Sequence, residues 1–188
     1  GDNAAGAVGV GVIEEGEALL SLGTSGVIFV AGNTFRSNPG SAAHAFCHAL
    51  PDRWHLMSVM LSAASCLDWA VKLTGTSDAG ELVRRAQTEA RLGGPEHFLP
   101  YLSGERTPHN NPHASGVLFG LGHDSGPAQI GQAVLEGVAF GMADGFNALV
   151  ESGVDVHSIS VIGGGAQSTY WGRILSAVLD CPMVYRDG

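Results

Sequence analysis

Apolar residues in the first half of the chain predict strands followed by a helix. Two β-prone runs, 18–22 and 27–30, flank the turn sequence Gly23-Thr24-Ser25-Gly26, which is typical of a β-hairpin. A third strand is predicted from Trp54 to Met60. Over 62–75 the apolar residues recur at helical spacing and end at a glycine, so we expect a helix there.

The second half of the chain predicts helices and strands in alternation. A helix is expected from Asp78 to Leu92, because the Gly93-Gly94-Pro95 break ends it. Residues 100–115 show no periodicity and contain prolines, so we expect a loop. Beyond a long helix, the pattern predicts a strand, a glycine turn, a helix and a short strand at 159–162, 163–165, 171–179 and 183–185. This order is that of an α/β domain.

The strongest helical signal runs from Pro127 to Val150. One apolar stripe follows it, made of Ile130, Val134, Gly137, Val138, Gly141 and Leu149. The polar residues off that stripe, which we expect on the side away from the core, are Gln132, Glu136 and Asp144. Glycines on an apolar stripe predict that a neighbouring element approaches closely.

Composition narrows the class of protein. A chain of 188 residues, 45% of them hydrophobic, is long enough for one domain with a substantial core. The net charge is −9 and Lys72 is the single lysine, so the basic footprint of a nucleic-acid-binding protein is missing. No apolar run reaches the ~20 residues that cross a bilayer, and no secretory leader pattern opens the chain. Membrane attachment is therefore not expected.

The cysteines favour a reducing compartment. Cys47, Cys66 and Cys181 are odd in number and far apart, and they lie among apolar residues. That arrangement fits buried free thiols rather than a disulfide framework. We therefore expect a cytoplasmic protein.

Two glycine turns follow apolar strands, Gly23-Thr24-Ser25-Gly26 and Gly163-Gly164-Gly165-Ala166-Gln167-Ser168. Such turns can direct several backbone N–H groups at an anion, and a helix N-terminus adds its positive end to the second turn. The plainer alternative is a simple hairpin turn and a closely packed strand-to-helix turn. A Walker A loop is excluded because the lysine it requires is absent, and the dinucleotide fingerprint lacks its later acidic residue.

Other polar residues allow more than one interpretation. Asp2 precedes small residues that could open a helix, so it is either an N-cap or a functional carboxylate. The pairs His44/His48 and His109/His113 have the four-residue spacing of metal ligands on a helix, but their surroundings indicate a strand and a loop. We therefore predict no metal site from them.

A longer motif gives a more specific indication. Gly116, Leu118, Gly120 and Leu121, then Gln129-Ile130 and Ala133-Val134-Leu135-Glu136, satisfy every defined position of the second signature of the FGGY carbohydrate kinases, which the chain resembles along its length. Three further segments are similar to the xylulose-specific members: 46–51, 54–58 and 103–108. The resemblance implies an actin-like ATPase domain with a ribonuclease-H-like fold, a mixed sheet flanked by helices.

The resemblance also implies roles for individual residues. Asp2 matches the catalytic general base, which would accept the proton of the sugar hydroxyl as its oxygen attacks the γ-phosphate of ATP. Gly23, Thr24 and Ser25 match the hairpin that faces the terminal phosphates. The adenosine pocket matches Gly163, Gly164, Gly165, Gln167 and Ser168. The implied cofactors are ATP and Mg²⁺, and the implied substrate is a ketopentose, D-xylulose, which is converted to D-xylulose 5-phosphate.

The resemblance finally sets expectations about extent. Residues 1–188 correspond to the C-terminal, nucleotide-binding domain, which we expect to be truncated at both ends and separated from an N-terminal kinase domain. We expect the chain to be inactive alone and to form homodimers. The alternatives are an FGGY kinase for ribulose, glycerol, fuculose or gluconate, or a non-catalytic actin-like nucleotide-binding module.

Overall fold

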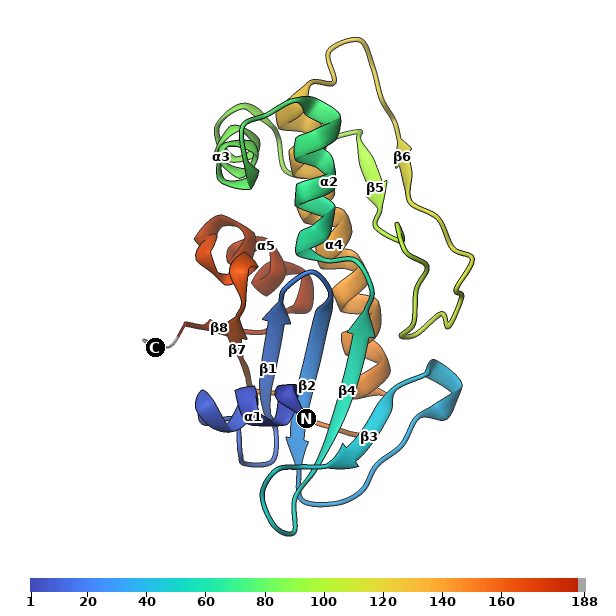
Figure 1. Ribbon diagram of the computed structural model, residues 1–188, viewed down its shortest axis with the longest axis vertical. Helices are drawn as coiled ribbons and strands as arrows, with labels where there is room; N and C mark the ends of the chain where they lie inside the picture. Colours follow the sequence, from blue (N-terminus) through green and yellow to red (C-terminus); the bar gives the residue numbers. More distant parts are fainter. Residues whose placement is uncertain (186–188) are drawn as a thin grey trace.

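The computed structural model describes residues 1–185, so the C-terminal end of the chain at Asp187-Gly188, where we expect a truncation, lies outside the described residues. A six-stranded mixed sheet has the order β3-β4-β2-β1-β7-β8, and β5 pairs with β6 in a separate ribbon (Figure 1). The helices, including the short 3₁₀ turns η1 and η2, are α1 (Asp2–Gly9), η1 (Pro39–Ser41), α2 (Ala64–Thr74), α3 (Ala79–Glu89), α4 (Pro127–Val150), η2 (Gly164–Gln167) and α5 (Thr169–Leu179). The strands are β1 (Glu17–Leu22), β2 (Gly26–Gly32), β3 (His44–Cys47), β4 (Trp54–Met60), β5 (His97–Leu99), β6 (Val117–Phe119), β7 (Ser158–Ile162) and β8 (Met183–Val184).

The sheet combines an antiparallel meander with two parallel strands. The predicted hairpin is confirmed, because β1 and β2 pair antiparallel with Leu22 opposite Gly26. The predicted third strand is β4, which pairs antiparallel with β2. On its other side β1 pairs in parallel with β7, so that Ser21 lies opposite Ile162, and β8 continues the sheet in parallel. The α/β class with a mixed sheet is therefore confirmed.

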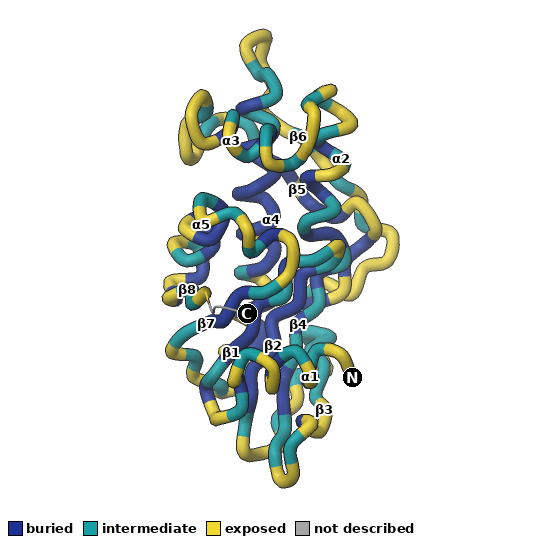
Figure 2. The backbone as a smooth tube through the Cα atoms, turned by 60° about the vertical axis from the view of Figure 1, so that its left-hand side comes forward, coloured by how far each residue is buried: buried dark blue, intermediate teal, exposed yellow. Residues whose placement is uncertain are grey.

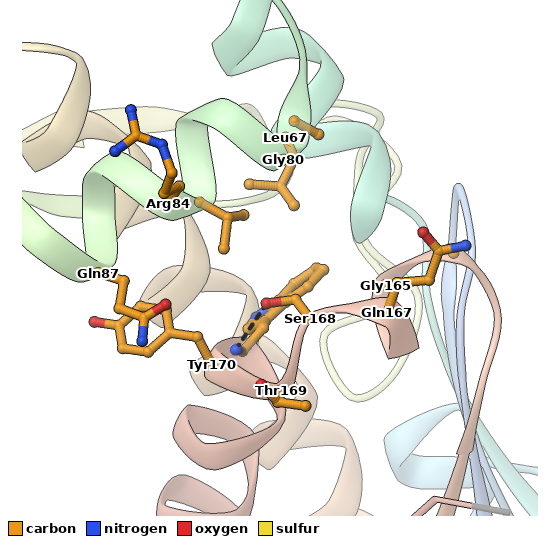
Figure 3. Close-up of a pocket in the computed structure, with 13 residues that line it drawn as sticks. Leu67, Gly80, Arg84, Gln87, Gly165, Gln167, Ser168, Thr169 and Tyr170 are labelled. Carbon is orange, nitrogen blue, oxygen red and sulfur yellow. Dashed lines mark hydrogen bonds between the residues drawn. The ribbon is translucent and has the colours of Figure 1, made fainter.

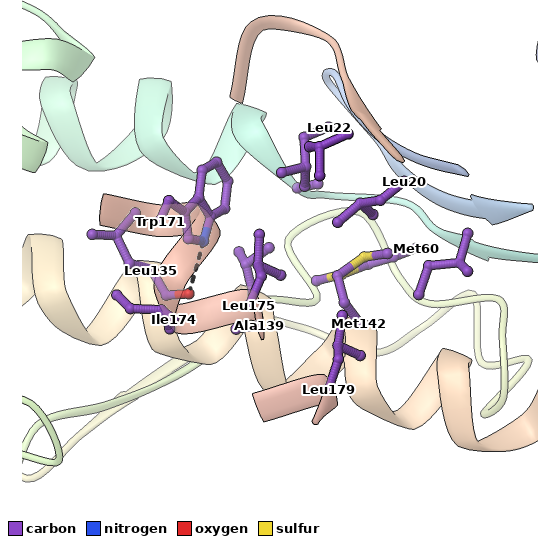
Figure 4. Close-up of a cluster of buried hydrophobic side chains, with 14 of the residues drawn as sticks. Leu20, Leu22, Met60, Leu135, Ala139, Met142, Trp171, Ile174, Leu175 and Leu179 are labelled. Atoms are coloured by element: carbon purple, nitrogen blue, oxygen red, sulfur yellow. Dashed lines mark hydrogen bonds between the residues drawn. The ribbon is translucent and has the colours of Figure 1, made fainter. Parts of the chain in front are cut away.

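Alternation along β1 and β2 creates two different faces of the sheet. Leu20 and Ile28 point to the larger core, which α2, α4 and α5 complete (Figure 4). Leu19 and Phe29 point the other way and pack with Ala4 and Ala7 of α1 in a much smaller cluster. Because successive residues of a strand face opposite sides, α1 lies across the sheet from the three larger helices.

Helix α4 is the central element of the larger core. It is long and apolar enough to cross a membrane, but 72% of its apolar window is buried inside the protein, as in the core helix of a soluble domain (Figure 2). The close neighbour predicted from its glycines is confirmed: a Cβ on Gly137 would collide with the carbonyl oxygen of Phe98, and one on Gly141 would lie 3.0 Å from Met60 Cε. Backbone and side chains of β4 and β5 therefore pack directly on α4.

Two polar residues of α4 do not lie where the pattern predicted. Gln132 and Glu136 are buried, with 3% and 8% of their surface exposed, whereas Asp144 is exposed as expected. The reason is that α3 and α5 both pack against α4 and cover its polar side as well. When a helix is packed on several sides, its apolar stripe alone predicts fewer buried residues than the structure has.

Three smaller predictions also need correction. Helix α3 ends at Glu89 rather than Leu92, because Ala90 already has an extended backbone. Asp2 is not an N-cap: Gly1 takes that position, and Asp2 lies in the first turn of α1 with its Oδ1 accepting from the Asn3 amide. Cys47 is exposed, since edge strand β3 turns it to solvent, whereas the other two thiols are buried.

Candidate functional site

The two glycine turns lie side by side at one end of the sheet. Strands β1 and β7 run in parallel, so their carboxyl ends meet at the same edge. The turn after β1 holds Gly23, Thr24 and Ser25, and the turn after β7 begins at Gly163. Their backbones touch: a Cβ on Gly163 would lie 2.6 Å from the carbonyl oxygen of Leu22. Two segments from opposite halves of the chain thus form a single edge.

The hairpin tip is fixed to the N-terminus of α2. The carbonyl of Gly23 accepts from the Ala64 amide at 2.9 Å, and the carbonyl of Thr24 accepts from the Ala63 amide at 2.9 Å and from Ser65 Oγ at 2.8 Å. Within residues 1–185, the amide and hydroxyl of Thr24 donate to no protein group, and Thr24 is exposed. The tip therefore turns its carbonyls inward and leaves donors for an anion outside.

The second turn is held by packing and by a helix cap. Gly163 has φ 91° and ψ 177°, a backbone conformation that suits glycine. Ser168 is the N-cap of α5, where its Oγ accepts from the Trp171 amide at 3.1 Å. Trp171 is fully buried and donates from Nε1 to the carbonyl of Leu135 at 3.1 Å. The cap and the anchored indole fix the start of α5 beneath the turn.

Two adjoining cavities form a groove along this edge. One, of about 310 Å³, is lined by Gly23 and Thr24 of the hairpin and Asp68 of α2. The other, of about 420 Å³, lies between α3 and the start of α5, where Figure 3 shows side chains of the two helices facing each other. The residues that line both are Leu67, Ala79, Gly164 and Gly165. Together the cavities fall within the size range of small-molecule sites.

Gly164 is the most informative residue of the groove. A Cβ on Gly164 would meet no atom within 4 Å, and its φ lies outside the range that only glycine favours. Neither packing nor backbone conformation therefore requires a glycine here. A missing side chain that the fold does not need leaves room for a ligand to lie against the backbone.

A chain of buried and partly buried hydrogen bonds holds Tyr170 at the wall of the larger cavity. Its hydroxyl donates to Gln132 Oε1 at 2.7 Å, and Gln132 Nε2 donates to Glu136 Oε1 at 2.7 Å. The same carboxylate oxygen accepts from the Gly93 amide at 2.9 Å. Burial and the nearby Glu136 raise the pKa of Tyr170, which keeps it a hydrogen-bond donor. The buried polar residues of α4 thus connect α5 with the segment that follows α3.

The candidate residues from the sequence are only partly brought together. Gly23, Thr24, Gly164, Gly165, Gln167 and Ser168 all line the groove. Gly163 and Ser25 do not line the groove: Gly163 packs against the backbone of Leu22, and the carbonyl of Ser25 accepts from the Gly23 amide at 3.1 Å.

Asp2 lies away from the groove, on α1 across the sheet. Burial first, and then the nearby His48, lower the pKa of His55 on β4 to about 4.

Sequence reasoning missed the wall that α3 contributes. Gly80, Arg84 and Gln87 line the larger cavity, facing the start of α5 (Figure 3). Arg84 is partly engaged, because its guanidinium forms an ion pair with Glu81 at 2.8 Å. No motif marks these residues, and their periodicity is that of any amphipathic helix. The helix itself was predicted from Asp78 onward, and in the structure Asp78 is its N-cap and accepts from the Glu81 amide.

Comparison with known proteins defines the class. The FGGY family of carbohydrate kinases, C-terminal domain, matches residues 18–187. The chain therefore belongs to the FGGY carbohydrate kinase family and corresponds to its C-terminal domain.

Individual relatives agree with this assignment. The chain is 57% identical over 188 residues to the xylulose kinase of Escherichia coli (strain K12). The aligned region covers 100% of this chain and 39% of that protein. The crystal structure of a xyloylose kinase from Brucella ovis matches 99% of this chain and 38% of its own, with a TM-score of 0.94 at 45% identity. The structure of Plasmodium falciparum glycerol kinase with ADP matches 98% of this chain and 38% of its own, with a TM-score of 0.89 at 19% identity. It therefore shares the fold of this chain. The chain thus spans about two fifths of the length of these relatives.

Proposed function

We propose that the groove binds an adenine nucleotide and that the chain is the nucleotide-binding part of an ATP-dependent sugar kinase. The observation that carries this proposal is the meeting of the two glycine turns at one groove, with Gly164 open to it. Phosphates would lie against the hairpin donors at Thr24, and the adenosine against the second turn. The 188 residues would act with a preceding N-terminal domain.

The residues of the groove fit such a nucleotide without a lysine. The hairpin tip offers an amide and a hydroxyl, and it is supported by the N-terminus of α2. Backbone donors of this kind bind phosphate in many proteins. Mg²⁺, when bound, neutralises phosphate charge, and its carboxylate ligand is expected from the N-terminal domain.

For the chemistry, we propose Asp2 as the general base. The carboxylate would take the proton of a sugar hydroxyl while the oxygen forms its bond to the γ-phosphorus and the bond to ADP breaks. Asp2 lies on the face of the sheet opposite the three large helices, so the sugar would approach that face from the other domain, and the terminal phosphate would have to extend beyond the hairpin tip toward it. D-xylulose is the proposed acceptor, giving D-xylulose 5-phosphate in the cytoplasm, because xylulose kinases are the relatives at 57% and 55% identity.

Association of two copies is also part of the proposal. The ribbon of β5 and β6 exposes Leu99, Val117 and Phe119, and exposed apolar surface favours association. A kinase with another sugar specificity is the alternative function.

The decisive experiment measures sugar-dependent ADP release with this chain alone and then mixed with the separately expressed N-terminal domain. We expect no turnover from the chain alone, because positioning supplies most of the rate of phosphoryl transfer. On mixing, we expect turnover with D-xylulose that Asp2→Asn lowers by roughly 10²–10⁴-fold.

The matched control is Asp155→Asn, which changes the same charge at a side chain that is 89% exposed. Preference of the mixture for ribulose, glycerol, fuculose or gluconate would replace the proposed substrate. Full activity of the Asp2 variant would remove Asp2 from the role of base.

A further inference from the structure

The hairpin end of the groove contains one unexpected charge. Asp68 is the only ionisable side chain among the described residues that line the 310 Å³ cavity; the others are glycine, alanine, leucine and threonine. Asp68 is exposed, and in the part of the chain that the structure describes its carboxylate has no hydrogen bond or ion pair. A carboxylate is a poor neighbour for phosphate groups, since like charges close together at a protein surface repel each other.

The fold places Asp68 about one helical turn from the hairpin tip. The Ala64 amide is bonded to the carbonyl of Gly23, so the start of α2 marks the position of the tip. Asp68 lies four residues further on, about 6 Å along the helix axis. It follows directly after Leu67, which lines both cavities. Asp68 therefore lines the same cavity as the hairpin tip, next in sequence to a residue that also lines the cavity between α3 and α5.

We propose that Asp68 accepts hydrogen bonds from the ribose 2′ and 3′ hydroxyls of the bound nucleotide and so selects ribonucleotides. This inference rests on the proposed nucleotide site. Between the phosphates and the base, the ribose hydroxyls are the donors that a nucleotide presents to an unpaired carboxylate. Carboxylates bind ribose hydroxyls in the same way in dinucleotide-binding domains. Repulsion from the phosphates is relieved because they lie one turn away, at Thr24.

Calorimetric titration of the chain with ADP and with 2′,3′-dideoxy-ADP, in EDTA and then in Mg²⁺, tests the inference. We expect the unchanged chain to bind the dideoxy nucleotide roughly tenfold more weakly, as for the loss of one or two hydrogen bonds to a charged group. Asp68→Ala should weaken ADP by the same factor and bind both nucleotides equally, with and without Mg²⁺. Alanine suits an exposed helix position, so the variant is expected to fold.

Each other outcome has a definite meaning. Asp155→Ala, the matched control at an exposed carboxylate away from the groove, should keep the preference for ADP. If Asp68→Ala retains that preference, the ribose contact is wrong. If the variant loses affinity only when Mg²⁺ is present, Asp68 binds the cation instead, and the inference is overturned. If ADP binds neither the unchanged chain nor Asp155→Ala, the nucleotide site itself fails, and the inference with it.

Discussion

The two glycine turns occupy equivalent places at the ends of parallel strands, yet their glycines differ in purpose. In the hairpin turn the carbonyls of Gly23 and Thr24 are bonded to α2, and a Cβ on Gly23 would find its nearest neighbour at 3.8 Å. In the second turn Gly163 and Gly165 are crowded, whereas Gly164 between them faces open space. The hairpin is therefore shaped by hydrogen bonds, and the second turn by close packing around one free position.

The difference shows that three consecutive glycines can be required for different reasons. The flanking glycines are explained by the fold alone, because the chain could not pass β1 with side chains at those positions. The middle glycine has no such explanation. Substitutions along the triplet therefore separate the needs of folding from those of binding, and they rank in a definite order.

The largest effect is expected for Gly163→Ala. A Cβ there would lie 2.6 Å from the carbonyl oxygen and 2.8 Å from the carbonyl carbon of Leu22, at a φ of 91°. Backbone cannot yield as a side chain does, so we expect a loss of roughly 2–4 kcal/mol in the free energy of unfolding. Urea unfolding followed by circular dichroism measures it as a lower midpoint with an unchanged slope. An unchanged midpoint would mean that the two turns are not in backbone contact.

Gly165→Ala should come second. Its Cβ would lie 2.8 Å from Leu22 Cβ and 2.9 Å from Trp171 Cζ3, both of them side-chain atoms. The indole is anchored through Nε1, so it moves less freely than an aliphatic chain, and we expect a cost of about 1–3 kcal/mol. The same unfolding experiment checks this. Stability equal to that of Gly164→Ala would show that the packing behind the turn is loose.

Gly164→Ala should have the smallest effect on stability, within about 0.5 kcal/mol. Its methyl group would enter the groove, so we expect ADP affinity to fall by on the order of tenfold. Calorimetric titration with ADP measures this fall. If the variant binds ADP normally, the ligand does not contact Gly164. The difference between the two turns would then have no role in binding.

Sequence reasoning was strongest where local chemistry decides structure. The hairpin around Gly23-Thr24-Ser25-Gly26, strand β4 and the C-terminal stop of α2 at Gly75 follow from turn chemistry and periodicity, and all three are confirmed. The family signature at Gly116–Glu136 indicated the fold class, also confirmed.

Tertiary packing decided the rest. Burial of Gln132 and Glu136 depends on which helices surround α4, and their contacts to Tyr170 and Gly93 join distant segments. Strands β5 and β6 have three residues each, too few for a periodic signal. The α3 wall of the groove and the position of Asp68 depend in the same way on how helices are placed. That Asp2 is the base, and that the groove holds a nucleotide, stay predictions.

The parallel pairing of β1 with β7 has a consequence for how the protein is made. Ala18 lies opposite Ile159, so the two strands are far apart in the sequence. On the ribosome, the hairpin and α2 emerge long before β7 does, and the groove then has only one of its two turns. Contacts of such long sequence separation form slowly, because the intervening chain must first be closed into a loop. The groove is thus completed only after β7 has been made, and a ligand that binds the groove would stabilise the finished domain rather than any shorter nascent chain.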